Sequence, residues 1–294
     1  MRWLVSGAGG LLGAHVVALL RTQRPDDSVT AATHDVLDLL DPARVAAVVP
    51  GHDIVVSCAA YNDVDGAQDR GPGAAAAVAV NTDGIGRLAA AASDAGALFL
   101  HLSTDYVMDG VAATPYREDA PTGPLQAYGA SKLAGEVLVL DTGGVVLRTA
   151  WLHDGAAGRS FVATMAVRAR AGEPSAVATD QVGQPTWVVP LAERVVALGT
   201  ATDSEGRPPT GVLHLVGAGA ASRIELARAV YARCGADPAL VSPTTSAEVV
   251  ARAAAEGRTV APRPAYSVLA DTRTVAYGLA PMPAWDAMLT DSLG

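Results

Sequence analysis

The chain has 294 residues, of which 50% are hydrophobic and 17% are charged, and its formal net charge is -9. This length allows one large domain or two smaller ones with a sizeable core, and the composition is that of an ordinary globular protein. The negative charge argues against broad binding to nucleic acid or to an anionic membrane, but a local basic pocket for an anionic substrate stays open.

Short apolar runs alternate with helical patterns in the first half of the chain. The patterns predict strands at 2–6, 28–32, 53–60, 97–103 and 145–151, and helices at 11–21, 41–49, 79–96 and 125–140. Asp41 is expected to cap the helix at 41–49, with Pro42 in its first turn. Continuous apolar strands separated by helices predict a parallel sheet covered on both faces.

After Trp151 the regularity loosens, because prolines and glycines become denser. Helices are predicted at 159–171, 188–200, 222–234 and 284–293, and a strand at 211–217. The predicted fold class is α/β, a Rossmann-like doubly wound parallel sheet followed by a smaller mixed α/β domain. The predicted domains are 1–150 and 151–294, and about 186–217 of the second is a candidate to return to the first sheet.

Nothing at the start of the chain resembles a signal peptide, and no apolar run approaches the roughly 20 residues that span a bilayer. A cytoplasmic location is therefore predicted, with no membrane or nucleic-acid partner. Cys58 lies in an apolar run and is interpreted as a buried thiol. No Cys/His spacing resembles a metal site, so no metal is expected.

The turn between the first strand and the first helix reads "VSGAGGLLGAH". Its pattern G-x-x-G-x-x-G permits a tight turn, close backbone approach to a pyrophosphate, and a helix N-terminus directed at the charge. Its position after a strand and before a helix predicts a dinucleotide-binding turn. The expected cofactor contacts in this turn are Gly7, Gly10, Leu11, Leu12 and Gly13.

The residues after the second strand do not decide between the two nicotinamide cofactors. An acid there favours the 2′-hydroxyl of NAD and an arginine favours the phosphate of NADP, but this chain has Thr33 and His34, with Asp35 slightly late. His34 is interpreted as a surface residue. NADPH and NADH both stay open, with NADPH favoured because biosynthetic reductions commonly use it.

Tyr128 and Lys132 are four residues apart in a predicted helix and so share a face. Lys132 is the only lysine among 21 lysine and arginine residues. Its ammonium is expected to lower the pKa of Tyr128 from about 10, which would make Tyr128 a better proton donor to a developing alkoxide. A compact ammonium can also reach between ribose hydroxyls, where a planar guanidinium fits poorly.

The segment "HLSTDYVMDG" follows the fourth strand, at the strand end where ligands bind in open α/β sheets. Ser103 and Thr104 can offer a hydroxyl to a substrate carbonyl oxygen there. The glycine turn, this segment and the Tyr/Lys pair, in this order, resemble the extended short-chain dehydrogenase/reductase superfamily. More narrowly, the chain resembles the dTDP-4-dehydrorhamnose reductase family. The similarity runs nearly end to end, through "CAAYNDVDGAQ", "AVNTDG", "PYREDAPTGPLQAYGASKLAGE", "DQVGQPT" and "PRPAYSVL".

The resemblance implies roles at matching positions. Thr104, Tyr128 and Lys132 would form the catalytic group. Besides the glycine turn, Tyr128 and Lys132, the resemblance implies further residues at the cofactor. Ala59, Ala60 and Tyr61 would lie along it, Asp38 would lie near the adenine, and Asn81 would fix the local geometry. The residues implied at a nucleotide-sugar are Ser103, Thr104, Asp105, Tyr106, Trp151, Gln181 and Pro185, with the Trp151 indole suited to stacking on a sugar or base.

Departures from the family pattern bear on the exact sugar. Met108 stands where the family often has phenylalanine, and Leu152 and His153 stand where valine and tyrosine are common. Some members dimerise through a metal held by acidic residues, but the first helix here carries His15 and no acid. The metal is therefore not carried over, and a monomer or weak homodimer is expected.

The activity that the resemblance implies is NAD(P)H-dependent reduction of the C4 ketone of a dTDP-4-keto-6-deoxy sugar. The first choice is dTDP-4-dehydro-L-rhamnose, converted to dTDP-L-rhamnose, and the alternative is a sugar of an antibiotic deoxysugar or dihydrostreptose-type pathway. A nucleotide-sugar epimerase or dehydratase is a further alternative, although Tyr106 stands where dehydratases have the elimination acid. The last alternative is a non-catalytic nucleotide-binding regulatory subunit.

Overall fold

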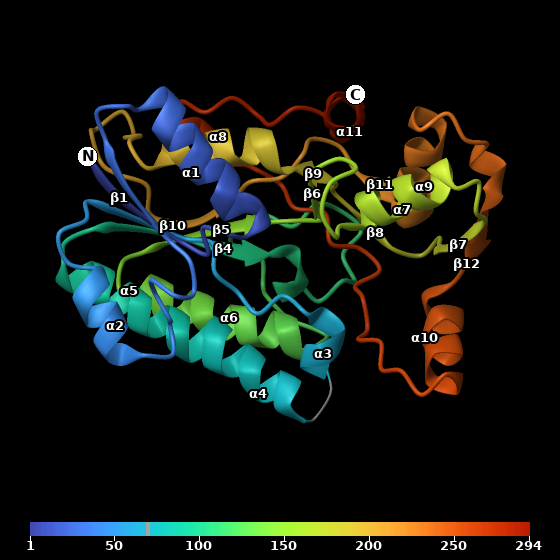
Figure 1. Ribbon diagram of the computed structural model, residues 1–294, viewed down its shortest axis with the longest axis horizontal. Coiled ribbons are helices and arrows are strands. Elements are labelled where there is room, and N and C mark those ends of the chain that lie inside the picture. Colours follow the sequence, from blue (N-terminus) through green and yellow to red (C-terminus); the bar gives the residue numbers. More distant parts are fainter. Residues whose placement is uncertain (69–70) are drawn as a thin grey trace.

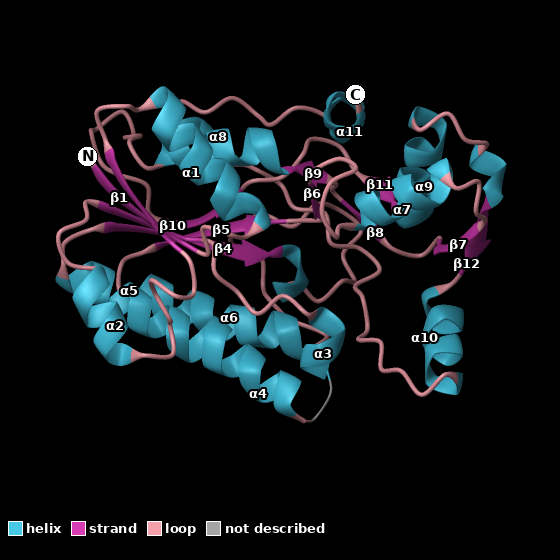
Figure 2. Cartoon of the chain, viewed as in Figure 1, coloured by secondary structure: helices cyan, strands magenta, loops and turns pink. Residues whose placement is uncertain are grey.

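The computed structural model of the chain describes residues 1–68 and 71–294. Its centre is a six-stranded sheet in the order β10-β5-β4-β3-β1-β2, and every pair of neighbouring strands is parallel (Figures 1 and 2). The strands are β1 (Arg2–Ser6), β2 (Ser28–Ala32), β3 (Ile54–Ser57), β4 (Leu98–Thr104), β5 (Val145–Thr149) and β10 (Gly211–His214). The predicted parallel α/β sheet is confirmed.

Helices cover both faces of this sheet, as Figure 1 shows. One face packs on α1 (Leu11–Gln23) and α8 (Val188–Leu198) through one apolar core. The opposite face packs through a second core on α2 (Pro42–Val48), α5 (Ile85–Asp94) and α6 (Ala127–Asp141). Most residues of the central strands β1, β3, β4 and β5 are buried, so the middle of the sheet is covered on both faces, which is the arrangement that continuous apolar strands favour.

Several element boundaries follow local chemistry. Asp41 caps α2 as predicted, since its carboxylate accepts hydrogen bonds from the backbone N–H groups of Ala43 and Arg44. The helix predicted at 79–96 is instead two consecutive segments, a π-helical segment η1 (Ala79–Gly84) and α5, and the helix α4 (Pro72–Val78), which was not predicted, leads directly into them. The short helix α3 (Val64–Gln68) precedes them, and the 3-10 turn η2 (Asp105–Val107) follows β4.

A second group of elements lies to the right of the sheet in Figure 1. Its core joins α7 (Phe161–Arg170), α9 (Arg223–Arg233) and α11 (Trp285–Leu293) with the parallel strand pair β7 (Ser175–Ala178) and β12 (Val241–Thr244). The remaining short elements here are β6 (Leu152–His153), β8 (Val182–Gly183), β9 (Thr186–Trp187), β11 (Ala221–Ser222), η3 (Pro238–Leu240) and α10 (Ser246–Ala255). The 3-10 turn η4 (Thr274–Tyr277) instead packs on the core of the main sheet through Tyr277.

One feature of this second region, helix α10, lay outside the sequence predictions, and the strand predicted at 211–217 is shorter than expected. Helix α10 begins with a capping box in which Thr245 and Glu248 bond to each other's backbone N–H groups, a signature that the sequence carried. The strand predicted at 211–217 ends at His214, and as β10 it pairs with β5 at the edge of the main sheet.

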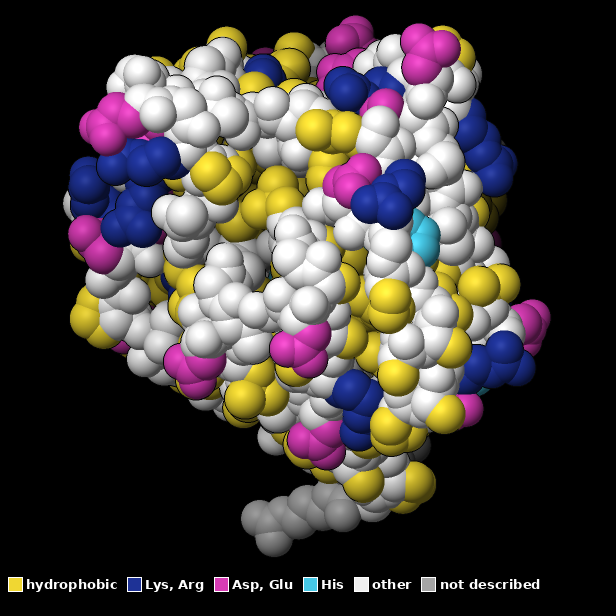
Figure 3. Space-filling model, turned by 90° about the vertical axis from the view of Figure 1, so that its left-hand side faces the viewer, with side chains coloured by type: hydrophobic (Ala, Val, Ile, Leu, Met, Phe, Trp, Pro, Cys, Tyr) yellow, Lys and Arg dark blue, Asp and Glu magenta, His cyan; other side chains and the backbone are white. Residues whose placement is uncertain are grey.

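The surface carries charges of both signs. On the face shown in Figure 3, basic side chains lie beside acidic ones rather than in one continuous patch. None of the helices in the described part of the chain combines the length and the apolar character needed to cross a bilayer.

Candidate active site

A cavity of about 470 Å³ runs along the carboxyl ends of the parallel strands. Its walls come from the segments that follow β1, β2 and β3, from the carboxyl ends of β4 and β5, and from one face of α6. The cavity includes every predicted cofactor residue except Asn81, namely Gly7, Gly10, Leu11, Leu12, Gly13, Asp38, Ala59, Ala60, Tyr61, Tyr128 and Lys132. The crevice at strand carboxyl ends is the usual ligand site of such sheets.

The glycine turn is packed so closely that a side chain at Gly7 or Gly13 would collide with backbone atoms. Gly7 has φ +67°, and a Cβ there would lie 2.6 Å from the backbone nitrogen of Ala59. A Cβ on Gly13 would lie 2.3 Å from the carbonyl oxygen of Gly7. The Gly10 N–H donates to that same Gly7 oxygen at 2.9 Å. The turn therefore leaves an open cradle at the start of α1, which fits a dinucleotide pyrophosphate.

Gly7→Ala is expected to remove most cofactor binding and to destabilise the protein, because the new methyl group meets backbone that cannot move aside. Gly96→Ala is the matched control, since Gly96 has φ +68° but nothing within 4 Å of its Cβ position. The control should lose only about 1–2 kcal/mol from the left-handed backbone and keep cofactor affinity. Titration of both variants with NADPH, alongside their thermal unfolding, tests this. Equal cofactor affinity in the two variants would contradict it.

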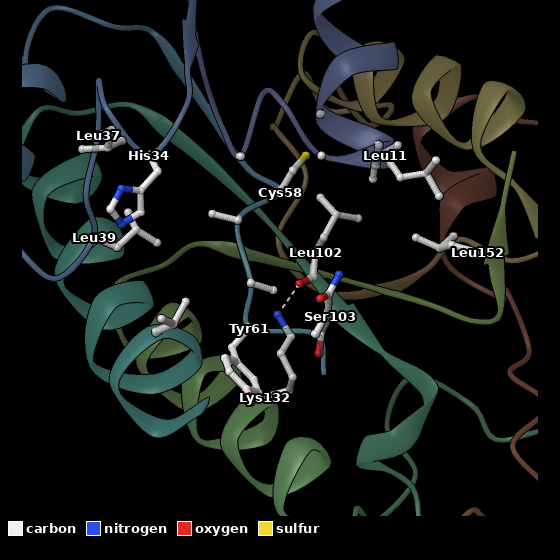
Figure 4. Close-up of a pocket in the computed structure, with 18 of the residues that line it drawn as sticks. Leu11, His34, Leu37, Leu39, Cys58, Tyr61, Leu102, Ser103, Lys132 and Leu152 are labelled. Carbon is white, nitrogen blue, oxygen red and sulfur yellow. Dashed lines mark hydrogen bonds between the residues drawn. The ribbon is translucent and has the colours of Figure 1, made fainter. Parts of the chain in front are cut away.

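One end of the cavity is formed by the segment after β2. His34, Leu37 and Leu39 lie there, and Leu11 and Leu152 lie at the opposite end (Figure 4). Asp38 shares this end, where its carboxylate accepts the Leu40 N–H at 2.9 Å and lies 3.6 Å from His34 Nε2. His34 is exposed, as predicted, but it also lines the cavity, which the sequence interpretation missed because it read the position only as surface.

Asn81 lies behind the cavity wall and is fully buried. Its side chain accepts the Tyr61 N–H and donates to the Tyr61 carbonyl, both at 2.9 Å, and also donates to Ser131 Oγ at 3.0 Å. Asn81 therefore ties the loop after β3 to helix α6. The π-helical turn that presents Asn81 is of a kind often found at functional sites.

Lys132 projects from α6 into the cavity wall with only 1% of its surface exposed. Its Nζ donates to the Leu102 carbonyl at 2.6 Å, drawn as the dashed line in Figure 4, and lies 3.1 Å from His101 Nε2. Burial lowers the pKa of Lys132 to about 8, an effect that Glu136 and Cys58 partly offset.

The expected lowering of the Tyr128 pKa is wrong for this structure. The protein around the phenol raises its pKa above the ordinary value, through burial first and then through unfavourable electrostatic interactions of its phenolate form with Asp105 and Tyr106. Lys132 does not oppose this, because its ammonium is directed at Leu102 and His101. Tyr128 is thus held as a protonated phenol that lines the cavity, with the Tyr106 ring edge-on at 6.4 Å.

The hydroxyls of Ser103 and Thr104 already have partners within the protein. Ser103 donates to the buried Glu136 carboxylate at 2.5 Å, and Glu136 also pairs with Arg148 at 2.7 Å. Thr104 donates to Asp105 at 3.1 Å and accepts the Tyr106 N–H. Either hydroxyl must therefore exchange a protein partner before it can reach a substrate carbonyl, which the sequence could not indicate.

Asp105 is buried, and its carboxylate accepts hydrogen bonds from Ser267 and Thr104. Burial raises its pKa from 3.8 to about 6, because these hydrogen bonds only partly offset the loss of water. Well below pH 4 the group is protonated in both the folded and the unfolded protein, and well above pH 6 it is ionised in both.

The free energy of unfolding is therefore expected to fall as the pH rises from about 4 to about 6, by roughly 3 kcal/mol at most. Asp105→Asn should lose this dependence. Asp53→Asn is the control, since its pKa is lowered to about 2 and it does not titrate in this window. Urea unfolding at several pH values measures the difference. If Asp105→Asn kept the wild-type dependence of the free energy of unfolding on pH, Asp105 would not be the group responsible for it.

The predicted substrate residues other than Ser103 lie outside the lining of this cavity. Tyr106 packs against Tyr128, and the Arg263 guanidinium lies 6.0 Å from the Tyr106 ring centre. Gln181 donates to Ser246 and lines a separate groove of about 390 Å³ beside α10. Pro185 is buried, and its carbonyl lies against Gly217.

Trp151 does not present a free ring face of the kind expected for stacking. The Arg223 guanidinium lies 3.5 Å from the ring centre, and a Cβ on Gly183 would lie 2.4 Å from the ring. Trp151 itself has φ +44°, a backbone conformation that strains a bulky residue. A ligand approaching Arg223 would therefore meet a cation layered on the indole.

Several residues of the site lacked a recognised sequence signal. Leu102 and Thr149 line the cavity at the ends of β4 and β5, so their places at strand ends were the available signal. Thr149 Oγ1 is buried with no hydrogen-bond partner among the described residues, which leaves it available to a bound molecule. Within residues 1–68 and 71–294, no group of three or more His, Cys, Asp or Glu side chains is arranged to hold a metal.

Comparison with known proteins gives one consistent result. The family model described as "RmlD substrate binding domain" matches residues 1–294. A dTDP-4-dehydrorhamnose reductase of Streptomyces griseus is 45% identical over 251 residues, which cover 83% of this chain and 80% of that protein. A probable dTDP-4,6-dihydroxy-2-methyloxan-3-one 4-ketoreductase of Streptomyces antibioticus is 44% identical over 254 residues, 84% of this chain and 82% of that protein.

Solved structures agree with the sequence relatives. The crystal structure of dTDP-4-dehydrorhamnose reductase from Bacillus anthracis in complex with NADP superposes with a TM-score of 0.86 at 28% identity. The superposition covers 99% of this chain and 97% of that chain.

Proposed function

The chain belongs to the dTDP-4-dehydrorhamnose reductase family, and from this premise we propose that the cavity holds NADPH or NADH beside a dTDP-4-keto-6-deoxy sugar whose C4 ketone is reduced. The single observation that carries the proposal is the meeting of three sequence-distant parts in one cavity. These parts are the glycine cradle after β1, the Asp38 end, and the Tyr128/Lys132 pair on α6.

Each residue at the cavity has a part that follows from its chemistry. The glycine turn fits the pyrophosphate, the Asp38 end fits the adenosine, and Lys132 fits the nicotinamide ribose. The dihydronicotinamide, when bound, supplies the hydride. Tyr128 is placed to donate its phenolic proton to the ketone oxygen as negative charge develops there, and its raised pKa keeps that proton present at neutral pH.

Thr104 is proposed as the second hydrogen-bond donor to the ketone, after its hydroxyl exchanges Asp105 for the substrate. Lys132 is proposed to act at the nicotinamide ribose rather than on Tyr128, because its ammonium is directed at Leu102 and His101, and it is more than half deprotonated above pH 8. Holding both reactants in one crevice supplies much of the rate acceleration, because the reaction then proceeds within a single complex.

The nucleotide-sugar is proposed to extend from Tyr128 toward the second group of elements. Asp105, Tyr106, Trp151, Gln181 and Pro185 remain the proposed contacts there. Arg223 joins them because its guanidinium covers Trp151, and a cation in this position suits an anionic substrate.

Among the possible sugars, dTDP-4-dehydro-L-rhamnose with dTDP-L-rhamnose as product is our first choice, supported by the name of the 45% identical relative. A sugar of an antibiotic deoxysugar or dihydrostreptose-type pathway is the second candidate. The 44% identical ketoreductase of Streptomyces antibioticus supports that alternative almost equally.

Purified protein tests the proposal when it is mixed with NADPH or NADH and a panel of dTDP-4-keto-6-deoxy sugars. The expected result is oxidation of one cofactor molecule for each sugar reduced, followed by loss of cofactor absorbance and by product mass. Sugar conversion without net cofactor consumption would favour an epimerase or dehydratase. Absence of turnover with every sugar would favour a regulatory nucleotide-binding role and would overturn the proposal.

Three expectations from the sequence stay predictions. They are the monomer or weak homodimer, the cytoplasmic location, and the division into a cofactor domain at 1–150 and a substrate-binding region at 151–294. The contact of β10 with β5 supports a return of part of the second region to the first sheet.

A further inference from the structure

Polar side chains lie in a row across the sheet, beneath the cofactor cavity. Ser6 ends β1, Ser57 ends β3, and His101 lies in β4. The strand register pairs Ser6 with Ser57 and Ser57 with His101. All three side chains are at most 1% exposed. Buried polar groups cost free energy unless they are hydrogen-bonded, so the partners of this row decide what it does.

The row faces helix α6. Along β4, Leu100 and Leu102 belong to the core under α1 and α8, so the alternate residues His101 and Ser103 point to the other face. His101 Nε2 lies 3.1 Å from Lys132 Nζ, and His101 Nδ1 lies 3.2 Å from Ser57 Oγ. The His101 ring also stacks on Phe99 at an interplanar angle of 10°. The imidazole is therefore fixed on several sides and directed at Lys132.

These contacts define the protonation of His101. A lysine ammonium can only donate hydrogen bonds, so Nε2 must be the acceptor and the ring must be neutral, with its proton on Nδ1. That proton is then directed at Ser57 Oγ. The surroundings agree, because burial and the charge of Lys132 both hold the pKa of His101 well below its ordinary value.

The ammonium of Lys132 has three N–H donors. One is taken by the Leu102 carbonyl at 2.6 Å and one by His101 Nε2. Both acceptors are held by the sheet, so together they fix the direction of the remaining donor. Lys132 lines the cofactor cavity, and the remaining donor is the one available to a molecule bound there.

We propose that His101 is a positioning residue for Lys132: its neutral imidazole, held by Ser57, takes one N–H of the ammonium and so directs the free N–H toward the cofactor ribose. The role of Lys132 at the ribose rests on the proposed function. The contact between His101 and Lys132 can be measured without turnover.

The composition of the chain provides a direct probe, because Lys132 is its only lysine. Protein labelled with ¹³C at lysine Cε gives a single lysine signal, whose chemical shift follows the ionisation of Lys132. In His101→Leu the titration midpoint is expected to fall by about one pH unit, since a buried ammonium loses an acceptor. In His101→Gln the side-chain oxygen can replace Nε2, and the midpoint should return close to that of the wild type.

The other titratable groups facing Lys132 are Glu136, Cys58 and Tyr128, and none of them changes in these variants. An unchanged midpoint in His101→Leu would overturn the proposal, as would equal shifts in the Leu and Gln variants. If His101→Leu does not fold, His101→Asn replaces it, because the shorter amide can reach Ser57 but not Lys132. A wild-type midpoint in His101→Asn would also overturn the proposal.

Kinetics provides the second measurement. His101→Leu is expected to lower kcat about tenfold while KM for the sugar changes less than about twofold, and His101→Gln should recover most of kcat. A loss in KM alone would contradict the positioning role. Protein that shows the expected lysine titrations but reduces no dTDP-4-keto sugar would refute the proposed activity and leave this inference standing.

Discussion

Lys132→Arg is expected to lower kcat by about 100-fold or more, although the formal charge of the chain does not change. Lys132 is 1% exposed, and its Nζ fits between the Leu102 carbonyl and His101 Nε2. A guanidinium is larger and planar, and it brings five donors to a place that offers two protein acceptors. Arginine must therefore move away from the cavity or leave buried donors unpaired.

The structure also changes the expectation for the stability of this variant. A surface lysine could be replaced freely, but a buried one cannot, so Lys132→Arg should destabilise the protein by about 1–3 kcal/mol. Thermal unfolding and kcat should be measured on the same preparation. Arg207→Lys is the matched control, because Arg207 is 64% exposed and should tolerate the reverse exchange.

The pH dependence of kcat separates the contribution of the Lys132 charge from that of its shape and position. Since the pKa of Lys132 is lowered to about 8, wild-type kcat is expected to fall as the pH rises through 8 and the ammonium loses its proton. Arginine does not deprotonate in this range. The residual kcat of Lys132→Arg should therefore not fall as the pH rises through 8. A variant with near-normal kcat and the wild-type dependence of kcat on pH would refute the role of Lys132.

Tyr128→Phe is expected to lower kcat by about 100-fold to 10,000-fold while leaving affinity for the cofactor nearly unchanged. The variant removes one oxygen atom from the cavity wall and with it the proton donor for the ketone oxygen. The ring, its contact with Tyr106 and the position of α6 should persist. The loss therefore belongs to the chemical step rather than to folding.

Tyr277→Phe is the control for this experiment, since Tyr277 lies in η4 and accepts only the Thr210 N–H at 3.3 Å. Single-turnover measurement of cofactor oxidation, together with cofactor titration, distinguishes the two variants. If Tyr128→Phe kept more than about a tenth of wild-type kcat, another group would have to donate the proton.

The sequence predicted the sheet and the cofactor cavity well because local rules govern both. The central strands are mostly apolar, and the spacing of Gly7, Gly10 and Gly13 follows from a steric demand that the structure confirms at Gly7 and Gly13. The positions of Tyr128 and Lys132 follow from a single helix. These features need no knowledge of long-range contacts.

The directions of hydrogen bonds could not be predicted in the same way. Lys132 was expected to act on Tyr128, its neighbour on the same helix, yet its ammonium bonds to β4. Ser103 was expected to face a substrate, yet it donates to Glu136. In both cases the partner comes from a different element, and only the packing of α6 on the sheet brings them together.

The same limit applies to Trp151 and Arg223, which are separated in sequence but stacked in the structure. A tryptophan at a strand end indicates a ligand-binding surface, but nothing near it in sequence shows that a guanidinium covers one face. His34 was correctly predicted to be exposed, but the sequence did not show that the same side chain also lines the cavity.

The pairing of β10 with β5 has a consequence for how the protein is made. One edge of β5 pairs with β10, whose synthesis is complete only at residue 214. Helix α1 packs on α8, which is also synthesised after residue 150. A nascent chain that stops at residue 150 would have an open strand edge and an uncovered apolar helix face, both of which favour aggregation. We expect residues 1–150 to become resistant to protease during synthesis only once β10 has been translated.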